Sequence, residues 1–195
     1  MIPAARPIIG EDERKAVDAV LASGGLAQGP QVAAFEDEFA AVVDGRRCVA
    51  VNSGTSALHM ALLALGIGPG DEVIVPSFTF AATANAVSLA GATPVFVDID
   101  LRTFCMDPAA AEAAITERTR AVMPVHLYGH PADMDRLSEI ARTPRSEDPG
   151  GRRPGPCRAM GRRPCGSARR RRGFQLLPDQ EHDLRRGRHG HDRLG

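Results

Sequence analysis

The sequence contains no apolar run long enough to cross a membrane. No stretch of its 195 residues approaches the roughly 18 consecutive apolar side chains that a spanning helix requires. The N-terminal residues become acidic at Glu11 and lack the apolar core of a secretory signal. The sequence therefore predicts neither a membrane protein nor a secreted one.

Cysteine is scarce, and its spacing fits no disulfide framework and no zinc site. The 4 cysteines include no Cys-x-x-Cys pair. Reduced thiols in a cytoplasmic protein are the prediction. A metal site could be imagined from five residues near the C-terminal end, but their spacing matches no zinc pattern. These residues are Cys157, Cys165, His182, His189 and His191.

Charge is distributed unevenly along the chain. Residues 1–142 hold 10 basic and 18 acidic side chains, whereas residues 143–195 hold 14 basic and 6 acidic ones. Only 10 of those last 53 residues are hydrophobic, and 29 are Arg, Gly or Pro. Such a segment cannot bury enough apolar surface to offset its ordering entropy. We therefore expect a folded region over 1–142 and an unstructured tail over 143–195.

Within residues 1–142, helical and strand patterns alternate. Short apolar strands between helices of roughly ten residues are typical of βαβ units and of a parallel sheet buried on both faces. The predicted fold class is therefore α/β, a mostly parallel sheet with flanking helices. The predicted helices are 11–22, 31–43, 55–65, 81–89, 108–115 and 134–141, and the predicted strands are 48–51, 72–75, 93–97 and 121–125.

The sharpest local motif lies between a predicted strand and a predicted helix, from Val51 to Leu58. Gly54 would let the backbone approach a ligand closely, and the hydroxyls of Thr55 and Ser56 could cap the helix. The free N–H groups of the helix start could bind a phosphate. The alternative is an ordinary capped helix start without a ligand. No Gly-x-Gly-x-x-Gly or Walker-type loop is present.

Two further candidates follow predicted strands, at the sheet edge where open α/β sheets bind ligands. Phe80 follows the strand over 72–75 and could cover a flat ring, or it could be a core residue. His126 follows the strand over 121–125 and could face a substrate, or it could be structural. The arginine run 169–172 could attract nucleic acid, but no aromatic platform accompanies it.

Residues 1–142 taken together resemble the N-terminal part of the DegT/DnrJ/StrS-type sugar aminotransferases. These enzymes use pyridoxal phosphate (PLP) on the type I aminotransferase fold. The resemblance implies that Gly54 and Thr55, with Ser56 beside them, hold the cofactor phosphate, that Phe80 stacks on the pyridine ring, and that His126 lies on the substrate side. The matching stretches are 28–30, 52–87, 91–100 and 124–135.

The resemblance also implies an activity and a set of partners. The family transfers an amino group, commonly from glutamate, to a keto group on a nucleotide-linked sugar. The implied partners are a small sugar substrate, an amino donor and, at full length, a second copy of the chain in a homodimer. The resemblance gives the fold as part of the large domain of the type I aminotransferase.

Three groups that the family needs should follow residue 142, and none is present. They are an acidic side chain for the pyridine nitrogen, a serine for the phosphate and a Schiff-base lysine. The chain has a single lysine, Lys15, which precedes every predicted strand. Because PLP chemistry starts from a lysine amine beside the aldehyde, the chain as written lacks its catalytic residue. We expect it to be inactive.

A shifted reading frame accounts for the tail. Read one nucleotide later, codons for residues 150–156 permit Glu-Asp-Ala-Ala-Gln-Ala-His, and those for 174–183 permit Phe-Ser-Phe-Tyr-Pro-Thr-Lys-Asn-Met. Gln180 followed by Glu181 permits only Lys or Arg in that frame. These segments resemble the missing ones, in the family's order. The prediction is a frameshift near residue 143; the alternatives are an inert truncated product and a non-catalytic basic-tailed binding protein.

Overall fold

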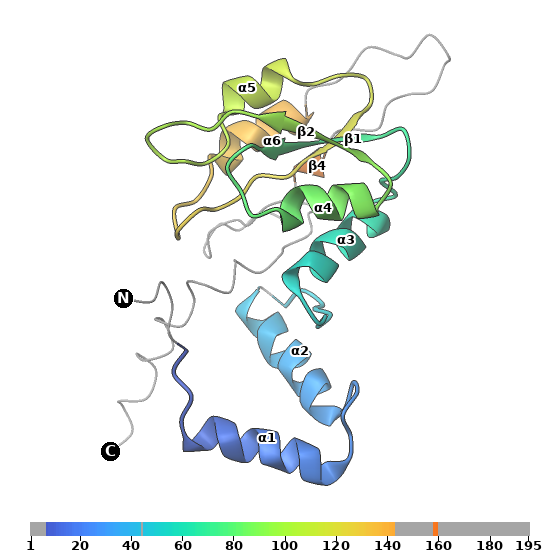
Figure 1. Cartoon of the computed structure of the whole chain (residues 1–195), viewed down its shortest axis with the longest axis vertical. Coiled ribbons are helices and arrows are strands. Elements are labelled where there is room, and N and C mark those ends of the chain that lie inside the picture. Colours follow the sequence, from blue (N-terminus) through green and yellow to red (C-terminus); the bar gives the residue numbers. More distant parts are fainter. Residues whose placement is uncertain (1–6, 44, 143–157, 160–195) are drawn as a thin grey trace. The chain divides into compact units, whose positions relative to one another are not determined.

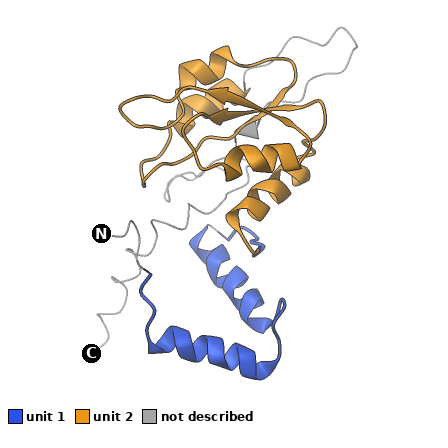
Figure 2. Cartoon of the chain, in the orientation of Figure 1, with its two compact units in different colours: residues 1–51, 179–195 blue, residues 52–178 orange. Residues whose placement is uncertain are grey.

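The computed structural model describes residues 7–43, 45–142 and 158–159 (Figure 1). The chain divides into two compact units, residues 1–51 with 179–195 and residues 52–178 (Figure 2). The described part of unit 1 holds helices α1 (Glu11–Ser23) and α2 (Pro30–Val42). Gly24 ends α1 in the left-handed conformation, with φ of 69°, and Pro30 begins α2 at a position where its missing N–H costs nothing.

The predicted strand over 48–51 is wrong: these residues form no strand in the structure. The amide of Ala50 donates to the Glu36 carboxylate at 2.7 Å instead of to a neighbouring strand. Val49 is 75% exposed, so the apolar run does not enter a core. An apolar run becomes a strand only where a partner strand takes its backbone hydrogen bonds, and the described sheet supplies none here.

Unit 2 is an α/β structure around a parallel sheet, as the sequence predicts. Its strands run in the order β2-β1-β3-β4, and every described pairing is parallel. No helix in the described ranges is long and apolar enough to cross a membrane. The elements are α3 (Gly54–Ala64), β1 (Glu72–Pro76), α4 (Ala82–Leu89), β2 (Thr93–Val97), α5 (Pro108–Ala113), β3 (Thr119–Val122), α6 (Met134–Arg142) and β4 (Arg158–Ala159).

Each face of the sheet carries its own apolar core, because side chains alternate along a strand. Val73 and Val75 of β1 pack with the buried residues of α3 and α4, among them Leu62 and Val87. Ile74, between them, belongs to the opposite core, where α5 and α6 pack. All five residues of β1 are buried, which explains why the sequence shows a continuous apolar run there and no alternation.

Two details of the sheet differ from the sequence prediction. The predicted strand over 121–125 begins at Thr119 and ends at Val122. The amide of Met123 still donates to the carbonyl of Ile74 at 2.8 Å, and Pro124 then has no N–H to continue the ladder. In addition, Arg158–Ala159, inside the predicted unstructured tail, forms β4 and pairs with β3. β3 has a second edge that accepts a parallel partner; the rest of 143–195 lies outside the described residues.

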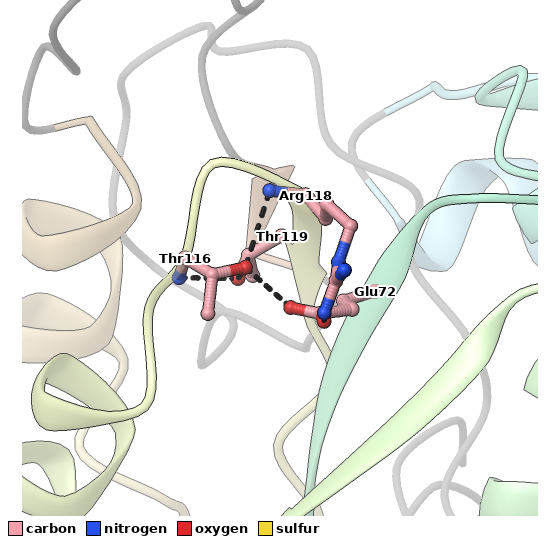
Figure 3. Close-up of polar contacts among 4 residues, drawn as sticks. All are labelled: Glu72, Thr116, Arg118 and Thr119. Atoms are coloured by element: carbon pink, nitrogen blue, oxygen red, sulfur yellow. Dashed lines mark hydrogen bonds and ion pairs between the residues drawn. The ribbon is translucent and has the colours of Figure 1, made fainter.

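The amino ends of β1 and β3 are joined by a polar cluster that we call the amino-end clamp: Glu72, Thr116, Arg118 and Thr119 (Figure 3). Glu72 is buried, and its carboxylate accepts from the Thr116 hydroxyl and from Arg118, whose Nε and Nη2 lie 2.9 and 2.6 Å from Oε1. The Thr119 hydroxyl accepts from the Thr116 amide at 2.9 Å. These bonds hold the pKa of Glu72 below its ordinary value, the Thr116 hydroxyl contributing most.

Candidate functional site

The predicted site residues lie at the carboxyl edge of the sheet, in the first turn of α3 and on loops that follow strands. A helix that returns to a parallel sheet runs opposite to the strands, so its first residues lie at their carboxyl ends. This places the starts of α3 and α4, which pack against each other, at that edge. The loops that follow β1, β2 and β3 begin at the same edge. Phe80 and His126 lie on two of these loops.

Ser53 is the N-cap of α3. Its hydroxyl oxygen accepts the Ser56 amide at 3.1 Å, and the Ser56 hydroxyl donates to Asn52 Oδ1 at 2.7 Å. The sequence prediction that Thr55 and Ser56 cap the helix is therefore wrong. Ser53 immediately precedes the apolar helix and has extended backbone angles, and this is the position that favours serine. The sequence carries the capping signal at Ser53, two residues before Thr55.

Capping by Ser53 leaves two backbone amides of the first turn available. Ser56 and Ala57 donate to Ser53, whereas the amides of Gly54 and Thr55 have no hydrogen-bond partner among the described residues. A Cβ added at Gly54 would meet nothing within 4 Å, so an incoming group has room there. Two free N–H groups at a helix start, reinforced by the helix dipole, are suited to a phosphate. The residues present fit the phosphate end of PLP.

Phe80 is not a core residue. Its side chain is 71% exposed, so the alternative of ordinary core packing does not apply. The backbone around it is fixed at both ends: the Ser77 amide donates to the Val97 carbonyl at 2.8 Å, and the Thr79 and Thr83 hydroxyls lie 2.8 Å apart. An exposed aromatic ring on a fixed loop at this edge can cover the face of a planar ligand.

His126 organises the loop after β3. Its Nδ1 accepts the Ala132 amide at 2.9 Å, which assigns the proton of the neutral ring to Nε2. Within that loop, Tyr128 and Gly129 have positive φ angles of 49° and 80°. The structure thus gives His126 a structural partner on one nitrogen.

Two further sequence candidates concern nucleic-acid binding and metal binding. The arginine run 169–172 and the five His and Cys residues considered for metal binding lie outside the described residues. Within the described ranges, no group of three or more His, Cys, Asp or Glu side chains is arranged to hold a metal ion. Cys48 and Cys105 are both free thiols.

Three comparisons with known proteins find relatives over the N-terminal part of the chain. The chain is 52% identical over 141 residues to the spore coat polysaccharide biosynthesis protein SpsC of Bacillus subtilis (strain 168), covering 72% of this chain and 36% of SpsC. It is similar to the crystal structure of S. venezuelae DesV in complex with a ketimine intermediate, with 52% identity, TM-score 0.61, and 67% and 36% of the two chains covered.

The third relative is a protein described as a sugar aminotransferase, Spr1654 from Streptococcus pneumoniae, in its PLP form. It is 41% identical, with a TM-score of 0.69, and the match covers 72% of this chain and 36% of Spr1654. The chain thus spans little more than a third of the length of these relatives. A family model matches residues 7–145, which is most of the chain. The chain belongs to the DegT/DnrJ/EryC1/StrS aminotransferase family.

Proposed function

We propose that this chain carries the phosphate-binding and ring-covering part of the PLP site of a sugar aminotransferase. The observation that carries the proposal is the start of α3, where the Gly54 and Thr55 amides have no partner among the described residues and lie beside open space. The PLP form of a relative at 41% identity supports the choice of ligand. An anion at this position would satisfy two backbone donors that the fold leaves available.

Each proposed residue has a separate task. Gly54 and Thr55 bind the phosphate through their amides, and Thr55 adds its hydroxyl. Ser56 supports them indirectly, because its amide and hydroxyl are used by the cap. Phe80 covers one face of the ring. When bound, PLP supplies an aldehyde that takes up amino groups and a ring that withdraws electrons.

The proposed reaction of the complete enzyme is transfer of an amino group from a donor such as glutamate to a keto group of a nucleotide-linked sugar. We place His126 on the substrate side, because it lies on the loop that follows β3. The lysine that the shifted reading frame permits at codons 180–181 would act as general acid and base in the proton transfer of this reaction. The complete enzyme would be a cytoplasmic homodimer.

The chain as it stands is proposed to bind the cofactor phosphate without catalysing transamination. Its single lysine, Lys15, lies in the first helix, whereas the resemblance implies a Schiff-base lysine after residue 142. We further propose that residues from about 143 onward are a frameshift product. The support is the composition of 143–195 and the ordered out-of-frame segments, and the family model that ends at residue 145 agrees with it.

A binding titration tests the phosphate site in the chain as it exists. Pyridoxamine phosphate needs no lysine, and its own fluorescence anisotropy reports binding in a protein without tryptophan. Thr55→Ala should weaken binding by about 10- to 100-fold, the value of one hydrogen bond to a charged group. Ser88→Ala, at an exposed position near the end of α4, is the matched control. Equal affinities of the two variants would reject the site.

Restoring the frame tests the activity. If one nucleotide is corrected near codon 143, the protein should bind PLP, turn yellow and transaminate. It should lose the absorbance change when the restored lysine is replaced by alanine. A corrected gene that reads into a stop codon, or that has no lysine in the Phe-Ser-Phe-Tyr-Pro-Thr-Lys segment, would overturn the frameshift proposal and leave an inert product.

A further inference from the structure

The loop between β2 and α5, residues 98–107, is held by several local hydrogen bonds. One oxygen of Asp100 accepts the amides of Arg102 and Thr103 at 2.8 and 3.0 Å, and these bonds lower the pKa of its carboxyl. Ile99 and Met106 form an antiparallel bridge across the loop. Cys105 and Met106 are buried in the core beneath α5 and α6. The loop is therefore a fixed protrusion at the carboxyl edge.

Phe104 occupies a strained position in this loop. Its φ of +57° lies in the left-handed region, where a bulky side chain is disfavoured and glycine is not. The Phe104 amide donates to the Asp100 carbonyl at 2.7 Å, and the buried Cys105 follows directly, so the neighbours enforce the angle. The Phe104 side chain nevertheless remains 49% exposed, so core burial is not what it gains from this position. Backbone strain of this kind is typical of residues at functional sites.

The Phe104 ring contacts the ring of Phe78, which lies two residues before Phe80 of the proposed site. Its centroid lies 6.0 Å from that of Phe78, with the planes tilted by 51°, which is a favourable arrangement for two aromatic rings. Phe78 stands two residues before Phe80, between the Ser77 bond to Val97 and the Thr79 contact with Thr83. Phe104 is thus a side support for the short segment 77–80.

We propose that Phe104 is a positioning residue for the cofactor ring. Its left-handed backbone directs the ring onto Phe78, and this contact fixes the segment that presents Phe80. The inference rests on the proposed function for the role of Phe80, but the positioning of Phe80 by Phe104 can be measured without any ligand.

A tryptophan reporter tests the positioning. Because the chain has no tryptophan, Phe80→Trp introduces a single fluorophore at the presented position. In that background, Phe104→Gly should increase acrylamide quenching and lower the anisotropy of the reporter, whereas Phe104→Tyr should restore both. Leu101→Ala, at an 81% exposed position of the same loop, is the matched control and should change neither. Unchanged quenching in Phe104→Gly would overturn the proposal.

The glycine variant also separates a functional role from a structural one. Because glycine adopts the left-handed angle freely, Phe104→Gly should keep or raise the urea midpoint of unfolding. The same change in the parent chain should weaken pyridoxamine phosphate binding between about twofold and tenfold, as expected for one aromatic pair. Phe78→Ala should reproduce this loss without altering a strained residue.

The outcomes distinguish the two proposals. Weaker binding in Phe104→Gly together with a looser reporter supports both of them. A second outcome is that Phe104→Gly increases the quenching of the tryptophan, but the parent chain binds no pyridoxamine phosphate. This result supports the positioning of Phe80 and rejects the proposed function. A third outcome rejects only the positioning of Phe80 by Phe104. In it, Thr55→Ala weakens pyridoxamine phosphate binding, whereas Phe104→Gly changes neither the binding nor the tryptophan signal.

Discussion

The two edges of the sheet differ in whether their polar groups have hydrogen-bond partners within the described protein. At the amino edge the amino-end clamp pairs a buried carboxylate with a hydroxyl and a guanidinium, and Arg120 adds an ion pair to Asp71 at 3.3 Å. At the carboxyl edge the amides of Gly54 and Thr55 are left available among the described residues. Polar groups satisfied within the protein contribute to stability, whereas groups left open can bind a ligand.

This comparison predicts that substitutions at the two edges will separate into two classes. Changes at the amino edge should alter the free energy of unfolding, and changes at the carboxyl edge should alter ligand affinity. Urea unfolding followed by circular dichroism, at low protein concentration, measures the first property. The pyridoxamine phosphate titration measures the second.

The largest effect on stability is expected from Glu72→Ala. The variant removes the carboxylate that accepts from Thr116 and Arg118, and it opens a gap at a buried position. We expect the free energy of unfolding to fall by about 2–4 kcal/mol. The Arg118 side chain is 70% exposed and stays solvated, which keeps the loss below that of a fully buried pair. Glu117→Ala, at an exposed position nearby, is the control. An equal loss of stability in this variant would show that the amino-end clamp contributes nothing specific.

Acid should weaken the amino-end clamp. The folded-state pKa of Glu72 lies below its ordinary value of 4.5. The clamp therefore stabilises the fold fully above that value, and its contribution is lost as the pH falls through the lower folded-state pKa. The difference in stability between the parent chain and Glu72→Gln should shrink as the pH is lowered from 6 towards about 3. A difference that does not change with pH would show that the carboxylate charge is unimportant.

Ser53→Ala should affect both measurements, because the cap belongs to the carboxyl edge and also to the fold. Loss of an N-cap costs about 1 kcal/mol of stability. The freed Ser56 amide and a less ordered first turn should also weaken pyridoxamine phosphate binding. Ser53→Asp can cap the helix and should recover the stability. Its negative charge should repel the ligand's phosphate, so the affinity should stay low. An affinity that recovers as fully as the stability would contradict a phosphate site at this helix start.

The smallest effect on stability is expected from Phe80→Ala. A side chain that is 71% exposed contributes little to the core, so the free energy of unfolding should change by less than about 0.5 kcal/mol. The affinity for pyridoxamine phosphate should nevertheless fall. A loss of stability comparable to that of Glu72→Ala would contradict the separation of the two edges.

The helices and the central strands could be predicted because their signals are local. Helix α2, predicted over 31–43 and observed over Pro30–Val42, follows from its apolar spacing, and the buried strand β1 follows from its apolar run. The resemblance to the aminotransferases, carried in part by residues 52–87, was local enough to indicate the family, and the family model matches residues 7–145. The cap at Ser53 was missed by two residues, although its signal is equally local.

Other features depend on partners distant in the sequence. Residues 48–51 have the composition of a strand and form none, because no described strand pairs with them. Arg158–Ala159 have no strand signal, and they pair with the free edge of β3. The left-handed backbone of Phe104 also escapes sequence analysis, since a bulky residue is not expected at such an angle.

The sequence by itself determined the α/β class, the helix start at Gly54 and Thr55, and the absence of a lysine after residue 15. Each of these features depends on residue types and short spacings, which do not depend on contacts with distant parts of the chain. Only the tertiary structure decided that Glu72 is a buried anchor, that Phe80 is exposed and that Phe104 lies against Phe78. These properties depend on which neighbours the sheet brings together, and residues 44 or 26 positions apart meet only after folding.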